Sequence, residues 1–417
     1  MSENTGARDV DWRTARALAH GAGRPLPFQT VNLADALGQT LAEPVHALQA
    51  IPHYASSAMD GWAVNGEPPW KLVSHAEDHT RGRPSPHADS GGVSLAPGEA
   101  TFILTGGVVP RNALGILRTE HGSIRGDLLD RNEAARPGEP SLHEHIRPAG
   151  EEAEEGSMAI PAGVVLNPAQ IALAAVCGHD TLAVLRAPRV SLLMTGDEVI
   201  DHGLPHPGQV RDTFGPQLPG FVAMLGGHVD VASRAKDDLD DVVAAISAEP
   251  TDESSLARAS GDVLITTGGT GSSSADHIRR ALTELGAELI IDGIAMRPGH
   301  PTLLARLPDG RFLVGLPGNP LAAMMAMLTV TAPLLAGLRG TALEEPAAVT
   351  SADAFEPLRG RSRLVPYRLE SGRAVPSTHQ RSGMLRGLAG ADGVMVVPAA
   401  GCEPGDDVPS LPLPWVG

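Results

Sequence analysis

The sequence has few aromatic residues, almost no lysine and only two cysteines. Aromatic residues make up 3% of the chain, so its cores are expected to consist of Ala, Val, Leu and Ile. Lysine occurs only at Lys71 and Lys236, and nearly all positive charge is therefore arginine. Cys177 and Cys402 show no C-x-x-C spacing, which argues against a zinc site or a disulfide framework and fits a reducing compartment.

The chain also lacks net positive charge and a signal-like segment. Its formal net charge is −17, whereas nucleic-acid-binding proteins usually carry a basic face, so no nucleic-acid partner is expected. No apolar run approaches the length of a membrane span, and residues 1–10 contain no apolar segment of the signal-peptide kind. We therefore expect a cytoplasmic protein without a membrane partner. An anionic small molecule would need a local cluster of Arg, His, metal or backbone N–H groups.

The 417 residues are enough for two to four domains. Residues 51–146 are rich in Pro, Gly, His and Ser with short β-like runs, which predicts a mostly β module. Residues 186–340 alternate strands and helices, which predicts a doubly wound α/β domain with a parallel sheet and ligands at the carboxyl ends of its strands. Residues 341–417 are typical of a small β-barrel or sandwich. In residues 1–50 we expect a short helix with Asp9 or Asp11 near its start, and then a strand followed by a helix between residues 29 and 47. In residues 147–185 we expect a helix with Pro168 at its first position and Gly178 just after its end.

Two glycine-rich turns, at residues 262–271 and 315–320, each follow a buried strand and precede a helical pattern. In this layout backbone N–H groups at a helix N-terminus can face an anion, which predicts a phosphate-bearing ligand. Pro320 fits the first helical turn, where its missing N–H costs nothing. A plain tight turn is the alternative interpretation of each segment, and helix capping is the alternative for Asp276.

Charged side chains follow other predicted strands. Arg297 offers a planar fork suited to oxyanions, and His300 can be neutral or charged near neutral pH. Asp197 and Glu198 are a carboxylate pair that could hold Mg²⁺. On composition alone, an ordinary loop or a helix cap explains these residues as well.

Seven motifs occur in order along the chain. They are S-A-M-D-G-W-A-V at residues 57–64, I-L-T-G-G-V-V-P at 103–110, G-E-E at 150–152, L-M-T-G-D-E-V at 193–199, the segment 265–276, M-R-P-G-H-P at 296–301 and G-L-P-G-N-P at 315–320. This series resembles that of the molybdopterin molybdotransferase (molybdenum insertase) family, which includes the E domain of gephyrin. The resemblance covers residues from about 25 to 340, and the last motif is identical to the family's.

The resemblance implies an elongated, four-part subunit that forms a homodimer. Residues 1–50 and 147–185 would form the elongated linker domain, and residues 341–417 the C-terminal β-barrel. The site would lie between the α/β domain and the β module of the partner subunit. Family members take adenylylated molybdopterin and molybdate, use Mg²⁺, insert molybdenum and release AMP. An upstream adenylyltransferase and downstream molybdoenzymes would be further partners.

Site residues follow by matching position. The catalytic set would be Asp60, Thr105, Glu198, Asp262, Arg297 and His300, and the metal ligands would be Glu152, Asp197 and Glu198. The binding residues would be Gly268, Gly269, Thr270, Gly271, Ser273, Asp276, Pro298, Gly299, Pro317, Gly318, Asn319 and Pro320.

The chain departs from the family pattern at four of these positions. Arg297 and His300 stand where the family has two lysines, Gly271 replaces Ser, and Glu152 replaces Asp. A catalytically weakened paralogue that binds or carries the cofactor without insertion is therefore the alternative prediction. An interaction scaffold, as in gephyrin's second role, is a third reading that no feature of the sequence supports.

Overall fold

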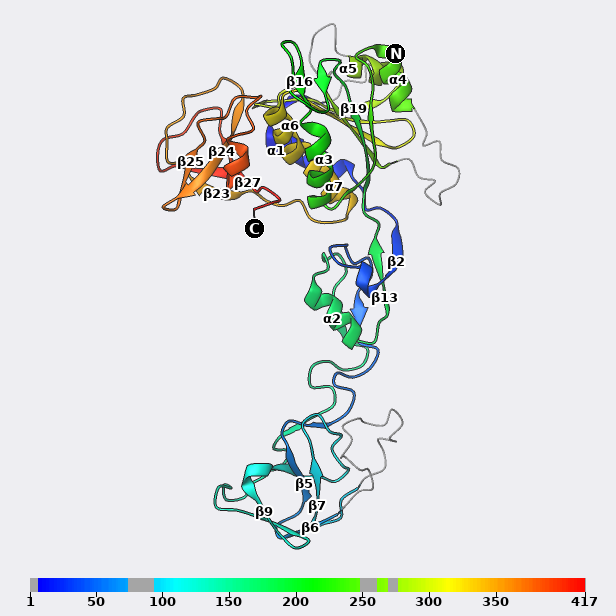
Figure 1. Cartoon of the computed structure of the whole chain (residues 1–417), viewed down its shortest axis with the longest axis vertical. Coiled ribbons are helices and arrows are strands. Elements are labelled where there is room, and N and C mark those ends of the chain that lie inside the picture. Colours follow the sequence, from blue (N-terminus) through cyan, green and yellow to red (C-terminus); the bar gives the residue numbers. More distant parts are fainter. Residues whose placement is uncertain (1–6, 74–93, 248–260, 269–276, 417) are drawn as a thin grey trace.

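The chain forms an elongated molecule whose parts are arranged end to end (Figure 1). The computed structural model describes residues 7–73, 94–247, 261–268 and 277–416. An α/β domain and a C-terminal β-sheet lie side by side at one end. A small linker domain lies in the middle, and a mostly β module forms the other end.

A seven-stranded sheet forms the centre of the α/β domain, in the order β1-β19-β21-β22-β18-β14-β17. Strands β17, β14, β18 and β22 run parallel, whereas β21 is antiparallel to both of its neighbours. The expected all-parallel sheet is therefore wrong at β21, because short loops without a helix join it to β19 and β22, and parallel neighbours need a long crossover. The strands are β1 (Ala7–Val10), β14 (Arg189–Met194), β17 (His228–Arg234), β18 (Val263–Thr267), β19 (Glu288–Ile294), β21 (Leu303–Arg306) and β22 (Phe312–Leu316).

Helices cover both faces of this sheet, as the sequence predicts for a doubly wound domain. One face carries α4 (Leu239–Ser247) and α5 (His277–Glu284), whose Val242 and Leu282 pack on Leu264 and Leu313. The other face carries α1 (Trp12–Ala22), α3 (Phe214–Met224), α6 (Pro320–Ala326) and α7 (Ala332–Leu338), which share one larger core with the strands.

The helical run Pro320–Leu338 is the centre of the larger core. It joins α6 and α7 through a π-helical segment, Met327–Thr331. In the described part of the chain it is the one helix long and apolar enough to cross a membrane, and 89% of its apolar window is buried inside the protein. The expectation that no apolar run approaches that length is therefore wrong. Burial on all sides explains the composition, since a helix surrounded by protein needs no polar face.

The N-terminal segment belongs to the α/β domain. Strand β1 pairs in parallel with β19, and α1 packs against α7. Asp11 caps α1 as its position suggests, accepting hydrogen bonds from the N–H groups of Arg13 and Thr14. The assignment of all residues 1–50 to the linker is corrected here. The signal missed is that Trp12, Ala15 and Ala19 form a buried stripe, which needs a large partner surface.

The linker domain contains two pairs of antiparallel strands, each formed by one strand from the N-terminal part of the chain and one from residues 147–185. Strand β2 (Phe28–Asn32) pairs along its whole length with β13 (Thr181–Leu185), and β3 (Val45–His46) pairs with β12 (Met158–Ile160). Helix α2 (Pro168–Val176) begins with Pro168 at its first turn, as predicted, and Gly178 follows it at φ +97°. The helix expected after β2 is only a single 3₁₀ turn, Leu33–Asp35.

The β module contains a six-stranded sheet in the order β8-β5-β7-β6-β10-β9. Trp62 and Trp70 are buried on it with Leu117 and Leu129. Its strands are β5 (Gly61–Asn65), β6 (Trp70–Leu72), β7 (Glu99–Ile103), β8 (Gly115–Arg118), β9 (Gly122–Arg125) and β10 (Leu128–Arg131), and β4 (Ser56–Ser57) pairs separately with β11 (Ile146–Arg147).

The C-terminal sheet is attached to the α/β domain by a shared strand. Strand β20 (Met296–Arg297), from the α/β part of the chain, pairs in parallel with the start of β24 (Ser362–Glu370). The order is β20-β24-β26-β27-β23, and no described pairing closes β20 onto β23, so a closed barrel stays a prediction. The remaining strands are β23 (Ala347–Thr350), β25 (Arg373–Pro376), β26 (Gly393–Val397) and β27 (Asp407–Leu411).

Candidate functional site

Three loops meet where the parallel strands end. The Thr195 hydroxyl donates to Thr267 O at 2.8 Å, and Gly268 N donates to Leu316 O at 3.1 Å. Gly268 has φ +82°, and a Cβ there would lie 3.1 Å from Thr195 Oγ1. A Cβ on Gly318 would lie 3.6 Å from Gly268 Cα. The described residues just after β14, β18 and β22 therefore lie side by side, and glycine permits the close approach at Gly268.

Carboxylates gather beside this surface. Asp197 and Glu198 follow β14 and are exposed. A third carboxylate, Asp237, follows the neighbouring strand β17. Partial desolvation raises the pKa of Asp237, and the charges of Glu198 and Asp197 raise it further, although a hydrogen bond with Thr195 and nearby His277 oppose the shift. Sequence reasoning missed Asp237. The signal is available, since the residue stands just after a strand that ends at the same edge.

These carboxylates offer the hard oxygen ligands that Mg²⁺ prefers. His277 Nδ1 is buried near them and has no hydrogen-bond partner among the described residues. This ring nitrogen could therefore form a hydrogen bond with a ligand. The ligand atoms of Asp197, Glu198 and Asp237 do not all lie within 4.8 Å of one another, so the three carboxylates are not a complete metal site by themselves, although a cation beside them would relieve their mutual repulsion.

The start of α6 differs from the anion cradle expected of it. Pro320 has no N–H, and the N–H groups of Leu321 and Ala322 both donate to Ser382 O, at 2.9 and 3.2 Å. The N-terminus of α6 therefore already binds the loop between β25 and β26 of the C-terminal region. What remains for a ligand is the exposed Gly318-Asn319 pair, whose backbone N–H groups donate to no described residue.

Residues 296–300 pack against the start of α6. Gly299 is buried at φ +110°, and a Cβ there would lie 3.3 Å from Ala322 O of α6. Arg297 is exposed and stands opposite Arg363 in the β20–β24 pairing. His300 Nε2 lies 2.7 Å from Asp9 Oδ1. Arg297 and His300 thus flank the buried Gly299, which packs on the start of α6.

The C-terminal sheet adds residues that sequence reasoning did not consider. Ser382 covers α6, a Cβ on Gly383 would lie 3.7 Å from Asn319 Oδ1, and Arg363 joins Arg297. The motif series ends near residue 340, and no local pattern in residues 341–417 indicates which loop folds back. The contacts of residues 341–417 with α6 are therefore known from the structure and could not be predicted from the sequence.

Asp60 and Thr105 form a pair at the edge of the β module. Asp60 Oδ1 accepts hydrogen bonds from the Thr105 N–H at 2.7 Å and from its hydroxyl at 2.8 Å. These bonds, the backbone one first, hold the pKa of Asp60 below its usual range. Both residues are exposed, and the linker domain separates their module from the α/β domain in Figure 1.

Glu152 is also remote from Asp197 and Glu198 within one chain. Its N–H donates to Ile51 O at 2.8 Å, which places it where the linker meets the β module. Its charge acts on Cys177, where burial raises the pKa of the thiol and Glu152 raises it further. Both cysteines are unpaired and buried, in agreement with the expected absence of a disulfide framework.

Asp262 is the one predicted catalytic residue of the α/β domain at the wrong edge. It precedes β18, and its carboxylate accepts two hydrogen bonds from Arg186, at 2.7 and 2.9 Å, and one from Arg189 N at 2.8 Å. This hydrogen bonding raises the pKa of Arg186. Asp262 therefore stabilises the amino-terminal edge of the sheet, opposite the edge at which Gly268 and Gly318 lie. Gly269, Thr270, Gly271, Ser273 and Asp276 lie outside the described residues.

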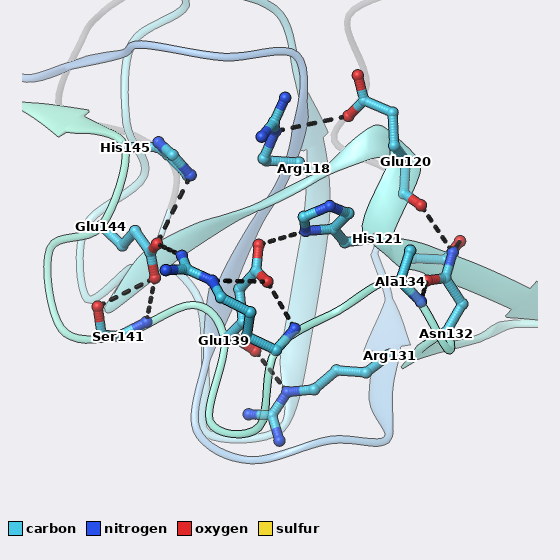
Figure 2. A network of polar contacts seen from close by, with 12 residues as sticks. Arg118, Glu120, His121, Arg131, Asn132, Ala134, Glu139, Ser141, Glu144 and His145 are labelled. Atoms are coloured by element: carbon cyan, nitrogen blue, oxygen red, sulfur yellow. Dashed lines mark hydrogen bonds and ion pairs between the residues drawn. The ribbon is translucent and has the colours of Figure 1, made fainter.

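A second group of carboxylates lies in the β module (Figure 2). Atoms of Glu139, Glu144 and His145 lie within 4.8 Å of one another, close enough for a metal ion. Arg136, however, forms ion pairs with both carboxylates, and His121 pairs with Glu139. Positive groups already fill the position that a cation would take, so this group is a structural network.

Three family models match the chain. They are the MoeA N-terminal region (domain I and II) at residues 10–178, the probable molybdopterin binding domain at 191–337 and the MoeA C-terminal region (domain IV) at 348–413.

Curated relatives and solved structures agree with these matches. A molybdopterin molybdenumtransferase of Nostoc sp. is 30% identical over 325 residues, which are 75% of this chain and 70% of the relative. One of Staphylococcus aureus is 28% identical over 383 residues, 89% of this chain and 88% of the relative. A molybdopterin biosynthesis MoeA protein from Pyrococcus horikoshii has a similar structure, with a TM-score of 0.76, 25% identity, and coverage of 97% of this chain and 99% of that one.

Proposed function

The chain belongs to the MoeA family of molybdopterin molybdenumtransferases, which acts in molybdenum cofactor biosynthesis, and we propose that it inserts molybdate into adenylylated molybdopterin with release of AMP. The observation that carries this proposal is the close approach of the residues that follow three parallel strands, where a Cβ on Gly268 would lie 3.1 Å from Thr195 Oγ1 and a Cβ on Gly318 would lie 3.6 Å from Gly268 Cα. Asp197, Glu198 and Asp237 add negative charge at the ends of β14 and β17, and Arg297 and Arg363 pair where the C-terminal sheet joins the α/β domain.

This arrangement suits a ligand with both a phosphate and an oxyanion. In the proposed complex the phosphate lies over Gly268, Gly318 and Asn319, with Pro298, Gly299, Pro317 and Pro320 shaping the surface. Arg297 and His300 bind molybdate, because a guanidinium fork fits an oxyanion and an imidazolium adds charge. Asp197, Glu198 and Asp237 would hold Mg²⁺, which supplies positive charge to the phosphate oxygens. The residues thereby stabilise the leaving AMP as the phosphoanhydride breaks.

We propose that the complete site needs a second copy of the chain. Asp60 and Thr105 form a prepared pair, yet their module lies at the far end of the molecule from the sheet edge. A homodimer that places this module over the partner's α/β domain would bring Asp60, Thr105 and Glu152 to the site. A two-fold assembly supplies two such sites. The remaining domain boundaries of the sequence analysis are part of this proposal.

Reconstitution tests the function directly. Purified full-length protein is mixed with adenylylated molybdopterin, molybdate and Mg²⁺, and AMP and active cofactor are measured, with the Nostoc relative assayed in parallel. AMP release that depends on molybdate is the expected result. A preparation that stays inactive while the relative works would refute the proposal.

One observation favours the second candidate, a carrier without insertion activity. His300, at the position of a family lysine, is held by Asp9, which leaves it less free than a lysine to follow a reacting group. Titration calorimetry with molybdopterin separates the two functions. Tight binding without AMP release supports the carrier, and replacing His300 with Lys should then raise turnover.

A further inference from the structure

The pair formed by Asp9 and His300 has a more specific arrangement than two adjacent surface charges. Asp9 belongs to the first strand of the sheet, whereas His300 belongs to the loop that packs on α6. His300 Nε2 and Asp9 Oδ1 are 2.7 Å apart. Strand β1 is the outermost strand of the sheet and pairs with β19. This pairing brings the Asp9 carboxylate next to His300, which lies 291 residues later in the sequence.

The backbone at this place is shaped around the Asp9 carboxylate. Asp9 adopts φ +47°, a left-handed conformation that is uncommon outside glycine. Gly293, on the neighbouring strand, has φ +91°, and a Cβ there would lie 2.9 Å from Asp9 Oδ1. Any other residue at Gly293 would therefore push the carboxylate away. Asp9 and Gly293 both have left-handed backbone conformations, and together they leave room for the Asp9 carboxylate. Such uncommon backbone conformations suggest that the Asp9 side chain has a function.

The sheet register places this pair at the candidate edge. Arg8 pairs with Asp292, Asp292 with Leu303, and Leu303 with Gly315. Asp9 is therefore level with Leu316, the last residue of β22. Two strands lie between β1 and β22, and neighbouring strands are about 4.8 Å apart, so Asp9 is roughly 14 Å from β22 along the sheet. Asp9 reaches the site only through His300, whose loop crosses toward α6.

We propose that Asp9 is a positioning residue for oxyanion binding, and that Asp9 and His300 form a carboxylate–imidazole pair where the family motif has its second lysine; this inference rests on the proposed function. Asp9 accepts from Nε2, which leaves Nδ1 without a partner among the described residues. Only the imidazolium donates from both ring nitrogens, so only that form bridges Asp9 and an oxyanion. The carboxylate fixes the ring and stabilises its charge when molybdate is bound.

The charged groups nearest the pair are three arginines and one aspartate. Arg8 and Arg279 both pair with Asp292, and Arg297 stands three residues before His300. A change at Asp9 is therefore expected to act on oxyanion binding through His300, its hydrogen-bond partner.

Molybdate binding to the full-length protein tests the inference by calorimetry. Asp9→Asn should weaken binding about tenfold at pH 6, since one charge-assisted hydrogen bond becomes a neutral one. In His300→Gln, the same Asp9→Asn change should add nothing. Arg8→Ala, which removes the neighbouring ion pair, is the matched control for strand β1 and should leave affinity unchanged.

Each outcome of these measurements supports or refutes the role of Asp9 in oxyanion binding. Asp9→Asn that binds molybdate equally well or more tightly, or that acts equally in the His300→Gln background, overturns the role of Asp9. Absence of AMP release in the unaltered protein would refute the proposed reaction instead, and the oxyanion measurement does not depend on it. Thermal unfolding of each variant shows whether a loss of binding reflects loss of the folded state.

Discussion

Two groups of carboxylates in this molecule have opposite environments. In the β module, Glu139 has 1% of its side chain exposed and is paired with Arg136 and His121. Burial alone would raise the pKa of Glu139, but hydrogen bonds from Arg136 N and His121 hold it below its usual range. At the sheet edge, Asp237 has a raised pKa because neighbouring atoms desolvate it and Glu198 and Asp197 repel its charge. Arg136 and His121 of the protein balance the charge of Glu139, whereas the negative charge around Asp237 remains available to a positively charged ligand.

This difference separates residues that hold the fold from residues that can bind. A buried carboxylate with all its partners stabilises one conformation, whereas carboxylates that repel one another gain from a cation. By the same criterion, Asp262 belongs with Glu139, since Arg186 and Arg189 satisfy it. Asp60 is intermediate, because it is exposed but has two donors from Thr105.

The largest effect is expected from replacing residues on the binding side. Asp60→Asn and Glu198→Gln should each lower turnover about 10²-fold or more without changing thermal stability. Mixing the two variants after subunit exchange should restore about a quarter of the activity if each site takes its β module from the partner. If both residues act within one chain, mixing restores nothing, and the shared-site proposal fails.

Replacing Glu139 with Ala should cost about 3 kcal/mol of unfolding free energy, because His121 and Arg136 N lose a buried carboxylate acceptor. Denaturant unfolding of the full chain measures this. Glu120→Ala in the same module, whose carboxylate is 68% exposed, should change stability by less than about 0.5 kcal/mol. Equal effects of the two changes would remove the distinction between network and surface.

Asp262→Asn should cost about 2 kcal/mol, since it weakens a partly buried bidentate ion pair. Turnover per folded molecule should stay unchanged, because Asp262 lies at the edge opposite the site. Loss of turnover in fully folded protein would return Asp262 to the catalytic residues.

The smallest effect concerns the pH dependence of stability at Asp237. Its folded pKa lies above its ordinary value of 3.8, so the native state binds the proton more tightly than the unfolded state. Stability should therefore fall as pH rises through this interval, and Asp237→Asn should remove that fall. Thermal unfolding against pH tests this, with Asp238→Asn, a conservative change in a helix-capping side chain, as the control. Mg²⁺ should stabilise the unaltered protein more than Asp237→Asn.

Local sequence patterns predicted much of this fold. Asp11 caps α1 and Pro168 stands in the first turn of α2, and the alternation of strands and helices expected for residues 186–340 forms the α/β domain. Helix and strand starts depend on neighbours in sequence, which a single chain displays. The direction of β21 and the pairing of β1 with β19 depend on distant partners, and periodicity carries no information about them.

The same division applies to the candidate site. Glycine-rich turns revealed Gly268 and Gly318 because strand, turn and helix adjoin in the sequence. Ser382 and Arg363 were missed because their role comes from the C-terminal sheet folding back on α6. The resemblance placed Asp262 in the site, but it could not show that the residue begins its strand whereas the site lies where the strand ends.

The pairing of β1 with β19 also orders events during synthesis. The ribosome releases α1 first, with Trp12, Ala15 and Ala19 on its apolar face, and then the linker and the β module. The partners of that face, in β19 and α7, emerge only afterwards. The nascent chain therefore carries an uncovered helix face while the β module is already free to fold, and closure of the α/β core is the late, long-range step.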